Sequence, residues 1–383
     1  MKNPKSIIIY GIIILLCIAA FGGYIVTRLS NEKDKTQAVQ AVQTIKAAEP
    51  PTVISEVTGA GAGASTVSNG DIKSKNEEEK QKHIQQVMNR ENEELDPNPS
   101  VGVGKGEDFA KATLDAVKNA GGLQNIIKKG DVVLIKPNLC VQTENFGSPM
   151  TTDYRVVQEV VKIAGECGAS KIIIAEGNFA SNAFENLENK YTTIKGAELY
   201  NFNDCKEKDC YELTPKKSLV GKAIFVPKVF MDADVVINVA KLKTHFLTNV
   251  SLGLKNCIGI PSYKIYGGSS SKDGLHSLGL EEVILDLNKI RKPEFTIIDG
   301  IIGGEGFGPY ANTPVKSNVV FAGKDTVAVD TVALNFMGFD LESVTHVKRA
   351  ADEKLGIADL NKIKVNGADL KSDSMKFSPA VEY

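Results

Sequence analysis

From about Val101 onward, the sequence alternates between short apolar runs and segments with helical spacing. The apolar runs are dense in Ile and Val without a polar residue at every second position, which is typical of strands buried on both faces. This alternation predicts an α/β layered domain with a mainly parallel or mixed sheet flanked by helices. The expected strands are Asp131–Lys136, Lys171–Glu176, Ala223–Val226, Asp234–Ala240, Phe295–Asp299 and Asn318–Ala322. The expected helices are Asp108–Asn119, Asp153–Cys167, Leu278–Lys289, Thr326–Met337 and Ser343–Lys354.

The N-terminus departs from this pattern, because Ile7–Val26 is a run of twenty residues without a charge. That length is enough to cross the hydrocarbon core of a bilayer as a helix. The alternative is a cleaved signal peptide, for which Ala19–Gly22 offers only a weak cleavage site. We predict an uncleaved, single-pass membrane anchor over residues 1–29, with the rest of the chain outside the cytoplasm. Arg28 and Lys33 follow the span and blunt the charge bias that sets its orientation.

Residues 30–100 are predicted to be a flexible, partly helical linker. Thr58–Ser68 is rich in Gly, Ala and Ser, a composition typical of a flexible chain. The charged segment Asn76–Leu95 favours a helix, but it has too few apolar positions to bury a face, and His83 within it is expected to be solvated. The α/β domain is then expected over residues 101–383.

Composition excludes some classes of function. A net charge of −2 gives no global basic field, so we expect no nucleic-acid partner. The six cysteines are too scattered for a disulfide framework. Cys205 and Cys210 either pair across a polar loop or are small core residues, and no C-x-x-C motif indicates a zinc or iron–sulfur site.

The most informative stretch is Val235–Ile260, where an apolar run opens into Lys241, Lys243 and His245. In an extended chain these three side chains share one face, each about 6–7 Å from the next. Lys255 and Asn256 close the stretch. One interpretation is a solvated strand end. Because burying such cations costs solvation unless an anion meets them, we favour an anion-binding site that also transfers protons.

Other predicted strands also end in polar residues, and the carboxyl ends of parallel strands meet at one edge of a sheet. Lys136-Pro137-Asn138 and Glu176-Gly177-Asn178 follow two of them, and each is either part of the site or a simple turn. Asp299 follows a third and leads into the glycine-rich Gly303–Pro309, which includes Glu305. That loop matches no established phosphate-binding pattern, so a lid or a tight loop is the simpler interpretation.

Two aspartates and three histidines complete the candidate set. Asp325 fits a helix N-cap. Asp330 lies in an apolar helical stretch, so we predict that it pairs with a site lysine or binds a metal. His276 is expected at a helix start or on the surface, and His346 on the surface of a helix. His245 is the best candidate for acid–base work, because the ordinary pKa of histidine lies near neutrality.

Five segments in this region resemble, in order, the successive blocks of the family known as domain of unknown function 362. The segments are Leu134–Leu139 (LIKPNL), Ile237–His245 (INVAKLKTH), Leu252–Gly259 (LGLKNCIG), Ile297–Pro309 (IIDGIIGGEGFGP) and Asp325–Gly338 (DTVAVDTVALNFMG). The resemblance spans about Val101 to Gly338 but implies no particular activity. Many members of that family carry a ferredoxin-like segment with closely spaced cysteines; this chain lacks one, so we expect no iron–sulfur cluster. The resemblance puts weight on Lys136, Asn138, Lys241, Lys243, His245, Lys255, Asn256, Asp299, Glu305 and Asp330.

Together these observations predict an enzyme that acts on a small anionic substrate, a carboxylate or a phosphorylated compound, with help from a divalent metal such as Mg²⁺. The alternative is a non-catalytic module outside the cytoplasm that binds an anion or a metal. The expected partners are the membrane, through the N-terminal helix, and the small anion. The predicted roles are catalysis for His245 and Lys243, substrate binding for Lys136, Asn138, Lys241, Lys255 and Asn256, and metal binding for Asp299, Glu305 and Asp330.

Overall fold

The structure, a computed structural model, describes residues 77–89, 94–139, 148–177, 184, 190–267, 273–309 and 311–380. All of these residues except Asp273 belong to one compact unit. The predicted membrane anchor and most of the predicted linker lie outside the described residues, so both stay predictions. Among the residues that are described, no helix combines the length and the apolar character that a membrane span requires.

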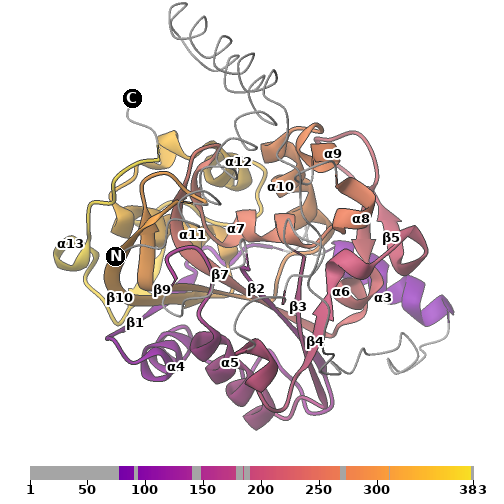
Figure 1. The fold of residues 1–383 in the computed structure, drawn as a ribbon, viewed down its shortest axis with the longest axis horizontal. Coiled ribbons are helices and arrows are strands. Elements are labelled where there is room, and N and C mark those ends of the chain that lie inside the picture. Colours follow the sequence, from indigo (N-terminus) through magenta and orange to yellow (C-terminus); the bar gives the residue numbers. More distant parts are fainter. Residues whose placement is uncertain are drawn as a thin grey trace, which may run out of the picture. The chain divides into compact units, whose positions relative to one another are not determined.

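A nine-stranded sheet forms the centre of the unit (Figure 1). Its strand order is β11-β1-β10-β9-β7-β2-β3-β4, and β8 pairs with β7 beside this path. The five strands from β9 to β4 run parallel to their neighbours, whereas β10 is antiparallel to both β9 and β1. The prediction of a mainly parallel α/β sheet is therefore confirmed. The strands are β1 (Ser100–Lys105), β2 (Val132–Pro137), β3 (Lys171–Glu176), β4 (Glu198–Asn201), β7 (Val235–His245), β8 (Asn249–Ser251), β9 (Phe295–Glu305), β10 (Thr313–Gly323) and β11 (Lys364–Asn366).

Helices cover both faces of this sheet. In Figure 1, α4 and α5 lie below it, and α7, α10, α11 and α12 lie above it. Alternate residues of β2 point to opposite faces of the sheet. Val133 and Ile135 belong to the core under α4 and α5, and Leu134 belongs to the core on the other side. The helices are α3 (Glu77–Asn89), α4 (Phe109–Asn119), α5 (Tyr154–Glu166), α6 (Lys228–Asp232), α7 (Gly253–Asn256), α8 (Tyr263–Tyr266), α9 (Asp273–His276), α10 (Leu280–Ile290), α11 (Thr326–Met337), α12 (Thr345–Asp352) and α13 (Leu370–Asp373).

Aspartates set the starts of three of the longer helices. Asp108, Asp153 and Asp325 are the N-caps of α4, α5 and α11, and each side chain accepts a hydrogen bond from a backbone N–H of the first turn. The N-cap predicted for Asp325 is thus confirmed.

The structure differs from the strand predictions in the pairing of one strand and in five strands that were not predicted: β1, β4, β5 (Cys210–Leu213), β8 and β11. The apolar run at Ala223–Val226 forms β6 (Ile224–Pro227), which pairs with β5 in a separate two-stranded sheet. Strand β1 was not predicted at all. Its glycines are required because a Cβ at Gly104 would lie 1.9 Å from the carbonyl oxygen of Ala112 in α4. A larger residue would therefore push α4 away from the sheet.

Helix α3 does bury a face, contrary to the expectation from its charged sequence. Ile84 and Val87 are buried in the core, and α3 contacts α6 and α10. His83 is half-buried, and its Nε2 lies 3.0 Å from the carbonyl oxygen of Met231 in α6. Two apolar residues three positions apart are enough to bury one face of this helix, because the rest of the unit supplies the surface against which they pack.

Candidate functional site

The predicted strand ends meet at one edge of the central sheet. Strands β2, β3, β7 and β9 run in the same direction, and their register places Lys136 beside Asn238 and Lys241 beside Asp299. The site residues that these strands carry therefore converge, as the parallel arrangement requires. The side chains of Lys136, Lys241, Lys243 and Asp299 are almost completely buried.

Lys136 meets an acidic partner from the neighbouring strand. Its Nζ forms a buried ion pair with Glu176 and also donates to Asn256 Oδ1 at 3.2 Å. A Cβ at Gly259 would lie 2.2 Å from Glu176 Oε1 and 2.8 Å from Lys136 Nζ, so this pair fits only beside a glycine. Lys136 and Glu176 are thus buried interaction partners and not merely turn residues.

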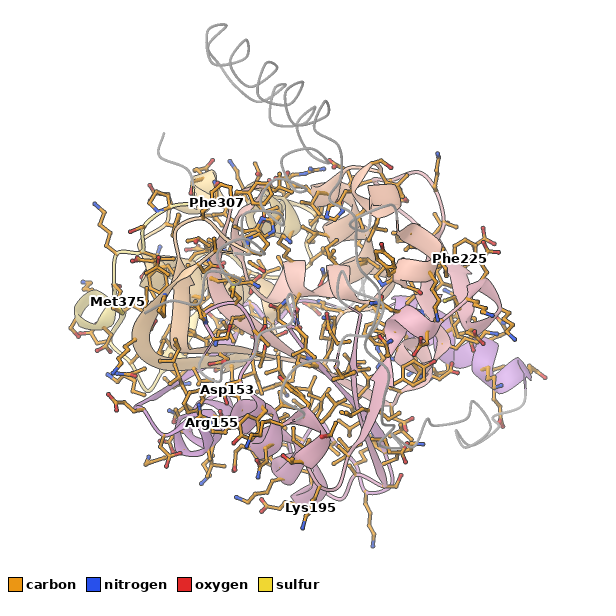
Figure 2. The ribbon with its side chains drawn as sticks, in the orientation of Figure 1. Asp153, Arg155, Lys195, Phe225, Phe307 and Met375 are labelled. Carbon is orange, nitrogen blue, oxygen red and sulfur yellow. The ribbon has the colours of Figure 1, made fainter. Side chains whose placement is uncertain are left out.

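Lys241 is neutralised in the same way. Its Nζ donates to Asp299 Oδ2 at 2.8 Å, and both side chains are fully buried. The same Asp299 oxygen accepts the backbone N–H of Asp153, whose side chain takes hydrogen bonds from Nε and Nη2 of Arg155. Figure 2 shows Asp153 and Arg155 side by side at the start of α5. The ion pair is thereby linked to a helix on the lower face of the sheet.

A chain of amides joins these pairs. Lys243 Nζ donates to Asn138 Oδ1 at 2.9 Å and to the carbonyl oxygen of Met150 at 2.7 Å. Asn138 Nδ2 donates to Asn256 Oδ1, and Asn256 Nδ2 donates to Asn238 Oδ1 at 2.7 Å. Asn238 was not predicted, although a lone amide inside the run VVINVA signals a buried polar contact. We call the following set the strand-end network: Lys136, Asn138, Glu176, Asn238, Lys241, Lys243, Asn256 and Asp299.

The three carboxylates predicted to bind a metal are engaged elsewhere. Asp299 holds Lys241, and Glu305 accepts the backbone N–H of Ser378 at 2.8 Å. Asp330 accepts the N–H groups of Gly253 and Leu254 at the start of α7. Burial raises the pKa of Asp330 to about 7, and these two hydrogen bonds oppose the shift.

Within the described ranges, no group of three or more His, Cys, Asp or Glu side chains is arranged to hold a metal ion. The prediction that Asp330 pairs with a site lysine is wrong. Its carboxylate accepts hydrogen bonds from the first N–H groups of the short helix α7, which point at it. The role of Mg²⁺ therefore stays a prediction.

His245 ends β7 in a distinct environment. Its Nδ1 accepts the backbone N–H of Leu247 at 3.1 Å, which leaves the ring proton on Nε2. Burial holds the pKa of His245 well below its usual value, and the charges of Lys255 and Lys243 lower it further. The imidazole is therefore neutral at pH 7, and its Nε2–H makes no hydrogen bond within the described part of the chain.

The glycine-rich segment packs against this end of β7. Thr244 Oγ1 donates to the carbonyl oxygen of Gly306, and Phe246 N donates to that of Gly308. Phe307 stacks on Phe246, which stacks on His245, with ring centroids 5.5 Å and 5.3 Å apart. Phe307 is 45% exposed, and Figure 2 places it near the top of the view. Gly303–Glu305 thus continue strand β9, and only Gly306–Pro309 form a turn, which borders the end of β7.

Two further residues act on His245. Lys255, in α7, is buried, and its charge lowers the pKa of both His245 and His346. His346 was expected on the surface, but it is fully buried in α12 together with Val347 and Ala350. Val347 and Ala350 follow His346 by one and four positions, a helical spacing of apolar residues that would have predicted its burial. We call His245, Lys255 and His346 the histidine cluster.

A relative with a known name aligns with 62% of this chain. The chain is 27% identical over 248 residues to the thylakoid-associated protein of Synechocystis sp., an alignment that covers 62% of this chain and 72% of the relative.

The family comparison covers the strands that carry the site. The match extends over residues 133–335, from β2 to the last turn of α11, and includes every residue of the strand-end network. It also includes His245 and Lys255, whereas His346 lies beyond its end. The match takes in more than half of the chain, and the chain therefore belongs to the family described as Domain of unknown function (DUF362).

Proposed function

We propose that the protein is an enzyme that acts on a small anionic substrate, a carboxylate or a phosphorylated compound, bound beside His245. One observation carries the proposal. His245 is buried, and the two lysines whose charges lower its pKa, Lys255 and Lys243, are both cations. An anion placed among such groups gains Coulombic energy in a region that excludes water.

The chemistry of the imidazole fits proton transfer. His245 carries its proton on Nε2, so it donates a hydrogen bond to an anionic oxygen. A bound anion raises the pKa of the imidazole, because it favours the charged form. Substrate binding then brings the pKa of His245 nearer to neutrality, where a general acid works best. We accordingly expect the affinity for an anion to rise as the pH falls from 8 to 6.

A non-catalytic anion-binding module is the second candidate. One observation favours it: the buried carboxylates of Glu176, Asp299 and Asp330 already hold lysines or backbone amides. A reaction that needs a free carboxylate base would find none among these three. The two candidates differ in the fate of the ligand, because an enzyme consumes it and a binder returns it intact.

The test uses the full chain, purified in detergent without chelator. Calorimetry measures the affinity for malonate and for inorganic phosphate in the wild type, in His245→Gln and in Lys243→Gln. We expect the wild type to bind at least one probe and both variants to bind it at least tenfold more weakly. Lys362→Gln is the matched control, because its side chain is exposed on a surface turn beside Asp359. Wild-type affinity in both site variants would overturn the proposal.

Native mass spectrometry of the same preparation separates the two candidates. It identifies any small anion or metal that stays bound through purification. Such an anion is then added back at known concentration and followed by NMR. Its conversion supports the enzyme, and its full recovery supports the binding module.

The location at a membrane is a further part of the proposal. It is supported by the apolar run Ile7–Val26 and by the name of the thylakoid-associated relative. Alkaline extraction of cell membranes is expected to leave the full chain in the membrane fraction and to release a chain that lacks residues 1–29. Protease added from the outside of intact cells then reports on which side the body lies.

A further inference from the structure

Two cysteines, Cys205 and Cys210, flank a short turn that closes tightly. The backbone N–H of Asp209 donates to the carbonyl oxygen of Lys206 at 2.8 Å, and the backbone N–H of Lys206 donates to Asp209 Oδ2 at 3.2 Å. None of the turn residues Glu207–Asp209 is buried. The turn therefore brings the chain on its two sides together while its own residues stay at the surface.

The cysteine side chains, in contrast, point into the body. Cys205 is 2% exposed, and Cys210, the first residue of β5, is 7% exposed. Both have an extended backbone, as the facing residues of a hairpin do. In a hairpin, residues one step beyond a hydrogen-bonded pair have Cα atoms about 4.5 Å apart, which lies within the span of a disulfide. The two thiols are accordingly in contact, and Cys210 donates a hydrogen bond to the sulfur of Cys205.

Both sides of the pair are fixed by further contacts. The carbonyl oxygen of Cys205 accepts the hydroxyl of Ser262 at 2.7 Å, and its Sγ lies 3.4 Å from Tyr200 Oη. Cys210 faces Pro227 in the pairing of β5 with β6. The thiols are thus held next to each other by the fold and do not meet only through a chance choice of rotamers.

The two thiols differ in reactivity. The hydrogen bond from Cys210 lowers the pKa of Cys205, burial opposes this shift, and the hydroxyl of Tyr200 adds to it. The same hydrogen bond, together with burial, raises the pKa of Cys210. Because the thiolate is the nucleophile in disulfide exchange, Cys205 is the thiol that reacts first.

We propose that Cys205 and Cys210 form a disulfide bond within the native fold when the protein meets a disulfide oxidant. The oxidant reaches the pair when the exposed turn opens. The Cys205 thiolate attacks one sulfur of the oxidant and releases the other as a thiol. The Cys210 thiolate then attacks the Cys205 sulfur of this mixed disulfide and releases the second thiol. Two cysteine thiols are oxidised and one disulfide is reduced to two thiols, so no other co-reactant is needed.

The bond would stabilise a segment that packs beside the strand-end network. Asn203, two residues before Cys205, accepts the backbone N–H of Tyr263 at its Oδ1, at 2.9 Å. A Cβ at Gly177, the residue after Glu176, would lie 2.9 Å from the same oxygen. A cross-link at Cys205 therefore holds in place the chain that borders the end of β3.

Peptide mapping tests the bond directly. The full chain, purified in detergent, is incubated with oxidised glutathione, its remaining thiols are blocked with N-ethylmaleimide under denaturing conditions, and it is digested with trypsin. Cleavage after Lys206 and Lys208 places Cys205 and Cys210 on separate peptides. We expect mass spectrometry to find the two peptides joined, and separate after reduction. The proposal fails if both cysteines carry the maleimide, if either keeps glutathione, or if either is joined to a different cysteine.

Thermal unfolding tests whether the bond fits the fold. A cross-link restricts the unfolded chain, so the oxidised wild type should melt roughly 3–6 °C above the reduced wild type. The difference should vanish in Cys205→Ser and in Cys210→Ser. It should persist in the control Cys167→Ser, which replaces a free cysteine at the end of α5. An equal or lower melting temperature of the oxidised wild type would overturn the proposal of a bond within the native fold.

The same peptides, from cells whose thiols are blocked during lysis, report on the location of the body. A joined pair supports the predicted position outside the cytoplasm, because disulfides are rare in the cytosol. A pair that joins with glutathione but is reduced in cells upholds the bond and counts against that location. Both readouts are independent of the proposed anion site at His245, so failure of that site leaves this inference standing.

Discussion

The strand-end network and the histidine cluster both include residues of strand β7, yet the network side chains hydrogen-bond one another, whereas three of the four ring nitrogens of His245 and His346 do not. In the network, Lys241 meets Asp299 and Lys136 meets Glu176, and amides connect the remaining groups. In the cluster, Nε2 of His245 and both ring nitrogens of His346 make no hydrogen bond to any residue that the structure describes. Buried charge is therefore not by itself a sign of a binding site. The network holds the sheet edge together, and the proposed anion site lies instead beside His245.

The largest expected effect comes from breaking an ion pair of the network. Lys241→Met leaves Asp299 buried without its cation and should lower the free energy of unfolding by about 3–5 kcal/mol. The double variant Lys241→Met/Asp299→Asn should lose less than the sum of the two single variants, because no charge is then stranded. Urea unfolding measures all three.

The exposed pair of Lys105 and Asp373 is the matched control for that prediction. Because water screens it, Lys105→Met should cost at most about 1 kcal/mol. A similar loss in Lys105→Met and Lys241→Met would show that the buried pair contributes no more to the fold than an exposed one.

A substitution at Gly259 tests how closely the Lys136–Glu176 pair packs against the backbone. In Gly259→Ala the new Cβ would meet Glu176 Oε1 at 2.2 Å, so we expect a loss of about 1–3 kcal/mol on urea unfolding. Gly165→Ala is the control, since no atom lies within 4 Å of its Cβ position in α5. That change should stabilise the protein by about 0.5–1 kcal/mol, because alanine favours a helix. If Gly259→Ala leaves the free energy of unfolding unchanged, the pair has room to move.

The pH dependence of stability sharpens the comparison on the side of the cluster. The pKa of His346 is about 3 in the folded state and near its usual value of 6.5 when unfolded. Between these values the unfolded chain binds the extra proton, so stability is lost as the pH falls below 6.5. The loss is up to about 1.4 kcal/mol per pH unit. His346→Leu should lose less stability than the wild type between pH 6.5 and 5, measured by urea unfolding. If the wild type and His346→Leu lose the same stability between pH 6.5 and 5, His346 does not titrate in this way.

The smallest effect concerns the aromatic stack beside His245. Phe307→Ala removes one stacked ring and should cost about 0.5–1.5 kcal/mol, nearer the lower end because Phe307 is 45% exposed. Leu360→Ala, which removes another exposed apolar side chain, should cost less than about 0.5 kcal/mol. Thermal unfolding distinguishes them. Equal losses would show that the stack adds nothing beyond ordinary surface packing.

Much of the fold could be predicted because the central strands are buried on both faces. Such strands leave uninterrupted apolar runs, and β2, β3, β7, β9 and β10 were all located from them. Short or polar strands leave no such run, which is why β1, β4, β5, β8 and β11 were missed. The run that became β6 shows a second limit, since apolar periodicity says nothing about which strands pair.

For the candidate site, the position of several residues could be predicted from the sequence, but their interaction partners could not. Lys136, Lys241 and Asp299 could be placed together because parallel strands end at one edge. Their partners could not be assigned, because pairing depends on register and on close approaches such as that of Gly259. Asp330 was expected to meet a lysine or a metal, but a tertiary contact with two amides of α7 determines its surroundings.

Helix α3 limits how far the body could stand from the proposed N-terminal anchor. A chain extends by at most about 3.5 Å per residue, so residues 77–89 would contribute roughly 45 Å of reach if they hung free. Ile84 and Val87 dock this stretch onto the body instead. If the proposed anchor holds the N-terminus in a membrane, shortening the segment before Glu77 is the direct way to bring the sheet edge with the candidate site closer to that membrane.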